Sequence, residues 1–252
     1  MPFALGKLPA SPSAKDFKLA DVLKVSFPIP PLRFGFGRLY ADWGMLGNDR
    51  YGDCVLAGAD HETMLYNYVN KGHKVEFDDA VCLGDYGAVT GFDPATGDGD
   101  TGTYVKDAMS FRRKTGVLAS DFSGRHKIDA YVSIDPGNWD MMVKATYTFG
   151  AVGIGFNVPD NIWSQTGGGH VWDFTDPNAS IIGGHYVPIV GSMDHRSRVT
   201  CITWGARQEL TKEFYQEYND EAWVPLSLET VRSGYGLRHL DVQALHDLLA
   251  QL

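Results

Sequence analysis

The chain has 252 residues, of which 44% are hydrophobic and 21% are charged, which is typical of a soluble globular protein with a substantial core. Its formal net charge of −9 at pH 7 argues against a nucleic-acid partner, because the phosphate backbone attracts basic surfaces. No apolar run approaches the length that spans a bilayer, so we expect no membrane partner and a cytoplasmic location.

The first 46 residues are rich in proline, which predicts an extended segment that lies over the rest of the chain. We call residues 1–46 the N-terminal strap. A helical turn is expected over 16–24. We expect about residues 8–36 to pack on the surface or to occlude the functional site partly.

Beyond the strap, apolar spacing of three to four residues predicts helices, and glycine-bearing or alternating apolar runs predict strands. The expected helices cover residues 54–70, 104–115, 138–147, 211–218 and 242–252. The expected strands cover residues 150–158, 185–190, 198–204 and 222–226. Helices that come first and strands that come later favour an α+β architecture in two lobes.

Cys54 follows a glycine-bearing loop over 47–53 and begins the first of these helices. The unpaired N–H groups and the dipole of a helix N-terminus favour a thiolate, so Cys54 is a candidate nucleophile. Asn48 lies six residues earlier, with an amide that can donate to an oxyanion beside the sulfur. We interpret Asp53 as the helix cap, because its charge would otherwise raise the pKa of the thiol.

His185 follows two glycines and opens an apolar strand, which makes it the candidate general base. His170 follows three glycines and is the alternative base. A buried, inert thiol and an ordinary core histidine are the structural alternatives for Cys54 and His185. Three cysteines are few and odd in number, which argues against a disulfide framework. We expect Cys82 and Cys201 to lie in the core.

The order of cysteine, Gly-His strand and Trp-Gly pair resembles the papain-like cysteine peptidase family, and within it a short bacterial or bacteriophage branch. Segments 100–108 and 151–158 add to a resemblance that covers about residues 8–226. It implies an α+β, two-lobed fold with a helical left lobe, an antiparallel β right lobe and the cleft between them. The implied peptidase domain covers residues 47–252, with lobes of about 47–135 and 136–252.

The resemblance also implies roles for individual residues. A glutamine of the family lines the oxyanion hole six residues before the cysteine, and Asn48 stands there. His185 takes the place of the base. The implied walls of the site are Trp204, Thr203 and Gly184.

The asparagine that orients the histidine in the family has no counterpart here, because Ile202 occupies its position two residues before Trp204. Thr203 is adjacent, but alternation along a strand predicts that it points to the opposite face. A backbone carbonyl, a water, Trp204 shielding the ring, or a carboxylate is left for this role. The candidate carboxylates are Asp173, Asp176 and Asp194.

The resemblance implies a cysteine hydrolase that cleaves peptide or isopeptide bonds through a thioester, with a peptide or protein substrate. We expect no cofactor and no metal, because the oxygen-rich loop over 93–100 lacks the final glutamate of a calcium loop. One alternative is a catalytically weak or inactive protein of the same fold, a binding or structural component with an assembly partner in a phage virion. The other is transglutaminase-like acyl transfer.

Overall fold

The structure is a computed structural model and describes residues 3–22 and 27–227. Its helices are α1 Leu19–Val22, α2 Cys54–Lys71, α3 Asp79–Thr90, α4 Val105–Lys114, α5 Trp139–Phe149 and α6 Lys212–Tyr218, with 3₁₀ turns η1 Asp160–Gln165 and η2 Asp194–Arg196. Its strands are β1 Phe34–Gly35, β2 Val117–Leu118, β3 Arg125–His126, β4 Ala130–Ile134, β5 Val152–Pro159, β6 Val171–Trp172, β7 Ile181–Met193, β8 Arg198–Thr203, β9 Ala206–Thr211 and β10 Asn219–Leu226.

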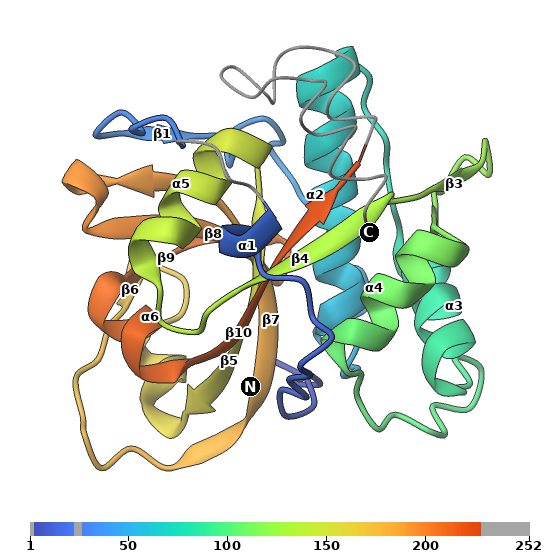
Figure 1. The fold of residues 1–252 in the computed structure, drawn as a ribbon. Helices are drawn as coiled ribbons and strands as arrows, with labels where there is room; N and C mark the ends of the chain where they lie inside the picture. Colours follow the sequence, from blue (N-terminus) through green and yellow to red (C-terminus); the bar gives the residue numbers. More distant parts are fainter. Residues whose placement is uncertain (1–2, 23–26, 228–252) are drawn as a thin grey trace.

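Helix α2 runs between the sheet and the other two helices of the helical half, α3 and α4 (Figure 1). It ends at Gly72, whose φ of 63° is left-handed and whose N–H donates to Tyr68 O at 3.0 Å. Its residues from Cys54 to Asn67 are all buried. A helix that is covered on every side belongs to the interior, so α2 connects the two halves of the molecule.

Over residues 3–22 and 27–227, the main sheet has eight strands and contains the order β4-β10-β5-β7-β8-β9-β6, with β1 paired to β7. All of its pairs are antiparallel except β6 with β9. Helices α5 and α6 lie on the side of this sheet away from α2, α3 and α4 (Figure 1). The mixed α+β fold class that the sequence predicts is therefore confirmed.

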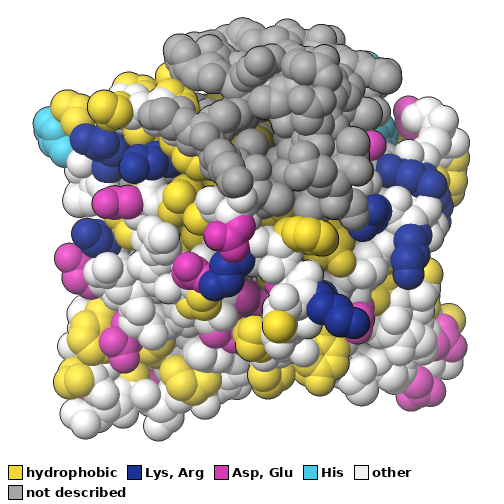
Figure 2. Space-filling model, viewed as in Figure 1, with side chains coloured by type: hydrophobic (Ala, Val, Ile, Leu, Met, Phe, Trp, Pro, Cys, Tyr) yellow, Lys and Arg dark blue, Asp and Glu magenta, His cyan; other side chains and the backbone are white. Residues whose placement is uncertain are grey.

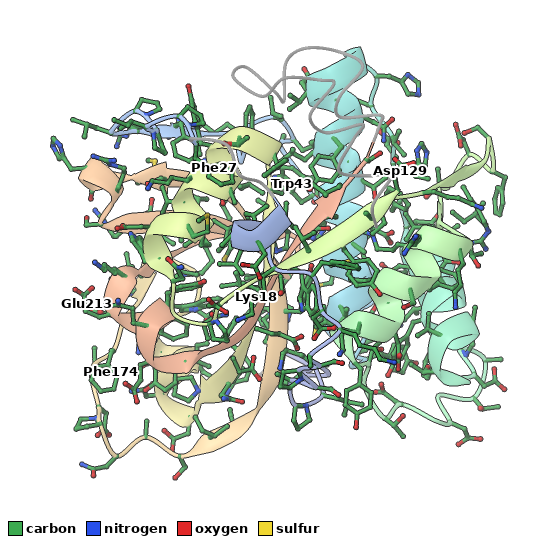
Figure 3. The ribbon with its side chains drawn as sticks, viewed as in Figure 1. Lys18, Phe27, Trp43, Asp129, Phe174 and Glu213 are labelled. Atoms are coloured by element: carbon green, nitrogen blue, oxygen red, sulfur yellow. The ribbon has the colours of Figure 1, made fainter. Side chains whose placement is uncertain are left out.

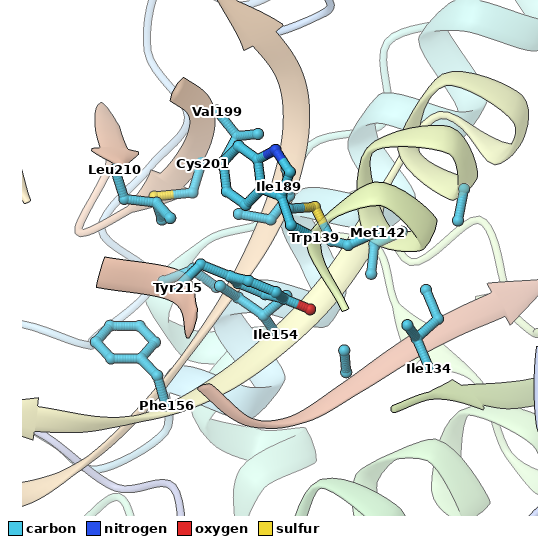
Figure 4. Close-up of a cluster of buried hydrophobic side chains, with 14 of the residues drawn as sticks. Ile134, Trp139, Met142, Ile154, Phe156, Ile189, Val199, Cys201, Leu210 and Tyr215 are labelled. Atoms are coloured by element: carbon cyan, nitrogen blue, oxygen red, sulfur yellow. The ribbon is translucent and has the colours of Figure 1, made fainter. Parts of the chain in front are cut away.

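The largest apolar cluster lies between the sheet and α5 and α6. Cys201 is fully buried there, beside Val199, Ile189 and Leu210 (Figure 4). Cys201 is thus a core residue, as its strand pattern predicts. A second cluster joins α2, α3 and α4, and it contains Cys54 and Cys82.

The expected helices and strands between residues 54 and 226 are present, and apart from one strand their ends move by no more than three residues. The exception is β7, which extends well beyond the predicted 185–190 in both directions. The expected helix over 242–252 lies outside the described residues. Helix α3 is absent from the sequence-based prediction, although Asp78 accepts from Val81 N at 3.0 Å and caps it. The lobe boundary near 135 stays a prediction. Strand β4 lies just before that boundary, in the predicted helical lobe, and pairs with β10 of the main sheet.

Acidic and basic side chains are interspersed on the face of the described residues drawn in Figure 2, and this face carries no broad basic patch. Lys18 lies on this face near β4 (Figure 3), where it forms an exposed ion pair with Asp135 at 2.8 Å. Among the described residues, no helix combines the length and apolar character needed to cross a bilayer.

Candidate active site

Cys54 is the first residue of α2, so its thiol lies at the N-terminal end of the helix as expected. The side chain is fully buried. Burial raises the pKa of the thiol to about 12 and outweighs hydrogen bonds to the backbone of Tyr186 and Gly6, which lower it. In this arrangement the sulfur is a neutral thiol, because the helix dipole does not offset the lack of solvent.

His185 lies on β7, in an aromatic enclosure of the sheet. Its ring stacks on Trp204, with centroids 4.4 Å apart and planes at 15°, and meets Phe156 edge-on at 5.7 Å. Burial lowers the pKa of His185 to about 3, so the imidazole is neutral. Its Nδ1 is buried with no hydrogen-bond partner among the described residues, which leaves that nitrogen available to a reacting group.

The nucleophile and base candidates come from opposite halves of the molecule and lie at one junction, where α2 packs on β7. The sulfur of Cys54 is hydrogen-bonded to the backbone of Tyr186, the residue that directly follows His185. Gly58 of α2 meets the Tyr186 ring so closely that a Cβ would lie 2.6 Å from its Cδ1. A side chain at position 58 would therefore push the helix away from the strand that carries the histidine.

Thr203 orients His185: its Oγ1 lies 2.7 Å from Nε2 of the imidazole. The expectation that Thr203 points away from the histidine is wrong. It is Ile202 that faces away, into a cluster with Val190 and Ala151. Thr203 lies on the face of β8 that also carries Cys201, so alternation along the strand holds, and it is Trp204, with a left-handed φ of 46° in the following turn, that departs from it.

The three candidate carboxylates make other contacts. Asp173 accepts from Thr211 Oγ1 at 2.8 Å, Asp176 accepts from Asn178 N at 2.8 Å, and Asp194 pairs with Arg198. The alternative base His170 is exposed. Neither these carboxylates nor His170 has a contact that would place it in the His185 enclosure.

Asn48 is buried on the loop before α2, and its amide nitrogen already has two acceptors. Nδ2 donates to Tyr51 O at 3.0 Å and to Asp53 Oδ1 at 2.9 Å. An oxyanion beside Cys54 would have to replace one of these acceptors. The amide is therefore held firmly by the loop in this state.

Asp53 occupies the N-cap position, but its side chain makes no capping hydrogen bond, so the expected cap is wrong. Its Oδ1 accepts from Asn48, and its Oδ2 lies 3.6 Å from Cys82 Sγ. Burial raises the pKa of Asp53 to about 8, so the carboxyl is largely protonated at neutral pH. A neutral Asp53 does not repel a thiolate at Cys54.

The start of the described chain lies between the two halves, next to these residues (Figure 1). Lys7 N donates to Gly184 O at 3.1 Å, Thr103 N donates to Gly6 O at 2.8 Å, and Leu8 N donates to Thr103 O at 3.0 Å. A Cβ at Gly6 would overlap Gly52 O. We call residues 3–8 the inserted segment; it begins before the stretch expected to occlude the site.

The inserted segment also covers the indole next to the histidine. Phe3 stacks on Trp204 at 4.8 Å and 21°, and Trp163 lies 5.6 Å from the same indole. Gly184 faces Lys7 O so closely that a Cβ there would overlap it. The three residues predicted as walls, Trp204, Thr203 and Gly184, thus all contact His185 or the inserted segment.

The structure superposes on solved structures of cysteine proteases. Xylellain, a cysteine protease from Xylella fastidiosa, superposes with a TM-score of 0.57 at 15% identity, over 88% of this chain and 96% of that chain. Procathepsin B from Trypanosoma congolense gives 0.57 at 11% identity, over 88% and 85%. The Carica candamarcensis protease CMS1MS2, solved with E-64, gives 0.54 at 12% identity, over 79% and 99%. The fold is papain-like.

No family model and no curated protein matches the sequence, so the papain-like fold is established by shape alone. The papain-like fold places Cys54 on its central helix and His185 on the facing strand. Sequence reasoning missed Gly6 and Lys7 of the inserted segment, together with the acidic partners of Lys7. The contacts between the Lys7 ammonium and its acidic partners span more than two hundred residues, and no local pattern signals them.

Proposed function

We propose that this protein is a cysteine hydrolase that cleaves peptide or isopeptide bonds, and that the inserted segment holds it in a latent state. The observation that carries the proposal is the junction of α2 and β7. There the thiol of Cys54, at the N-terminus of α2, lies next to Tyr186, the residue that follows His185. Within the part of the chain that the structure describes, Nδ1 of His185 has no hydrogen-bond partner.

The reaction needs the thiolate of Cys54, formed when its proton passes to Nδ1 of His185. Sulfur attacks the substrate carbonyl, the C–S bond forms, and the oxyanion is held by the backbone N–H of Cys54 and by Asn48 once its amide leaves Tyr51 O. His185 gives its proton to the leaving amine as the C–N bond breaks. Water, deprotonated by His185, then cleaves the thioester and restores the thiol.

Removal of the inserted segment is required for two reasons. The segment occupies the space beside the sulfur, and its presence keeps Cys54 and His185 in surroundings where both charged forms are disfavoured. Solvent or substrate dipoles that replace it would favour a thiolate and imidazolium pair.

The test uses the full chain and a Gly6→Ala variant. A methyl group at position 6 overlaps Gly52 O and should expel the segment. Gly84→Ala on α3, where a Cβ meets nothing within 4 Å, is the matched control. We expect iodoacetamide to label Cys54 of the Gly6→Ala variant at least about tenfold faster than Cys82 or Cys201, because those thiols stay buried.

The same variant should hydrolyse a fluorogenic peptide library, and Cys54→Ala should abolish that activity. Acetylation of Lys7, which is buried in the inserted segment, reports independently whether the segment has left. If the segment leaves but Cys54 labels no faster than Cys82 and no peptide is cut, the hydrolase proposal is overturned in favour of a binding or structural protein. Products joined to an added amine would indicate acyl transfer instead. The bacterial or bacteriophage branch, with a virion location and an assembly partner, stays a prediction.

A further inference from the structure

Lys7 is buried beside the candidate nucleophile, which is rare for a lysine. The exposed fraction of its side chain is 0%, and its Nζ lies 2.7 Å from Asp220 Oδ2 and 3.3 Å from Glu221 Oε1. Nζ also donates to Leu8 O at 3.0 Å. The ammonium therefore has three oxygen partners in place of water.

The site that encloses Lys7 is built by the sheet and not by the strap. Glu221 at the start of β10 pairs with Gly155 of β5, and a Cβ at position 155 would overlap the Lys7 stem. Trp223 Nε1 donates to Glu221 Oε2 at 2.8 Å, so the carboxylate is held from its far side. The acidic, glycine-floored site should therefore persist when the inserted segment leaves. We call it the Lys7 site.

The residue that occupies the Lys7 site directly follows the residue that contacts the sulfur of Cys54. Gly6 forms a backbone hydrogen bond to Cys54 Sγ, and the N–H of Lys7 donates to Gly184 O, directly before His185. A peptide that follows the same path past Cys54 would present a side chain to the Lys7 site. That side chain would belong to a residue close to the bond that is cut.

We propose that the Lys7 site selects substrates with a lysine or arginine close to the scissile bond, and that Lys7 stands in for that side chain. This rests on the proposed function. A neutral side chain would leave the carboxylates of Asp220 and Glu221 without a counter-charge. Asp220 Oδ1 is buried with no partner among the described residues. The two parallel N–H donors of an arginine guanidinium could therefore bind both oxygens of this carboxylate.

The first measurement needs no catalysis and uses the full chain with Cys54→Ala. Acetylation of Lys7 by a small amine reagent is compared, by mass spectrometry, with that of the exposed Lys15. Asp220→Asn with Glu221→Gln should raise the Lys7 rate at least about tenfold, because both charge-assisted contacts are lost. Asp135→Asn, which removes the exposed partner of Lys18, should leave it unchanged. Equal protection of Lys7 in all three proteins would contradict the role given to the carboxylates.

The second measurement compares peptides that carry lysine, arginine or norleucine at one position at a time, cleaved by the Gly6→Ala variant. Norleucine keeps the stem length and lacks the charge. At one position within two residues of the cut, lysine and arginine should raise kcat/KM at least about tenfold over norleucine. Adding Asp220→Asn and Glu221→Gln should remove that preference and leave iodoacetamide labelling of Cys54 unchanged.

The two failures are distinguishable. Hydrolysis with no preference for a basic residue at any position would overturn the Lys7-site proposal and leave the hydrolase intact. No hydrolysis and no fast labelling of Cys54, with Lys7 freely acetylated, would overturn the hydrolase itself.

Discussion

The imidazole of His185 is fixed from two directions by neighbouring residues of one turn: Thr203 Oγ1 lies 2.7 Å from its Nε2, and Trp204 stacks on its face at 4.4 Å. Trp204 has a φ of 46°, a left-handed value that is rare for a bulky residue. This turn lets two consecutive residues reach the same ring. When Nε2 carries the proton and donates to Thr203, Nδ1 is the nitrogen that can accept a proton from Cys54.

Replacing Thr203 tests this orientation. In the Gly6→Ala background, Thr203→Val should lower kcat by about ten- to a hundredfold, because the ring loses the partner that selects its rotamer and tautomer. Thr203→Ser keeps the hydroxyl and should restore most of the rate. Steady-state kinetics on a fluorogenic peptide measures both, and a serine variant as slow as the valine variant would refute orientation by the hydroxyl.

Asn48 should matter for hydrolysis but not for alkylation. Asn48→Ala should lower kcat by about a hundredfold, since an oxyanion donor is lost. Alkylation of Cys54 by iodoacetamide forms no oxyanion and should change little. A matching loss of labelling would show instead that Asn48 only holds the loop through Tyr51 O and Asp53.

The raised pKa of Asp53 predicts an unusual pH dependence of stability. The folded pKa is about 8 against an ordinary value of 3.8, so between about pH 4 and pH 8 the native state binds the extra proton. Its contribution to the free energy of unfolding falls as pH rises through this window, by up to about 1.4 kcal/mol per pH unit. Asp53→Asn should remove this slope.

Denaturant titrations of wild type and Asp53→Asn at several pH values measure the difference directly. The comparison is made between the two proteins because burial also raises the pKa values of Asp60, Glu62 and Glu221. A difference in unfolding free energy that is constant from pH 4 to pH 8 would show that Asp53 titrates normally.

The buried pair of Arg112 and Glu62 supports α2 behind the site. Arg112 Nη1 lies 2.5 Å from Glu62 Oε2, and Glu62 Oε1 accepts from Tyr186 OH at 2.9 Å, which ties the helix to β7. Arg112→Met should lower the free energy of unfolding by about 3–5 kcal/mol, because it leaves a buried carboxylate uncompensated.

The control for this ion pair is Lys18→Met, which removes the exposed pair with Asp135 and should leave the denaturant midpoint nearly unchanged. Equal midpoint shifts for Arg112→Met and Lys18→Met would contradict the importance of burial.

Local sequence patterns predicted the features that depend on nearby residues. The helix that begins at Cys54, the apolar strand that follows His185 and the core position of Cys201 all follow from spacing, glycines and apolar runs. Helix α3 was missed, although Asp78 is an ordinary cap signal. The family resemblance added the α+β papain-like fold, because the order of these features along the chain is specific even where identity is low.

Only the tertiary structure decided which side chains meet. The left-handed backbone of Trp204 lets its indole reach the ring that Thr203 also contacts. The pairing of β10 with β5 creates an acidic site that Lys7 enters from the other end of the sequence. The buried state of Cys54 likewise depends on a segment nearly fifty residues away. Spacing along a chain determines the backbone period and the helix ends, whereas hydrogen-bond partners and desolvation depend on contacts that form only when distant segments pack together.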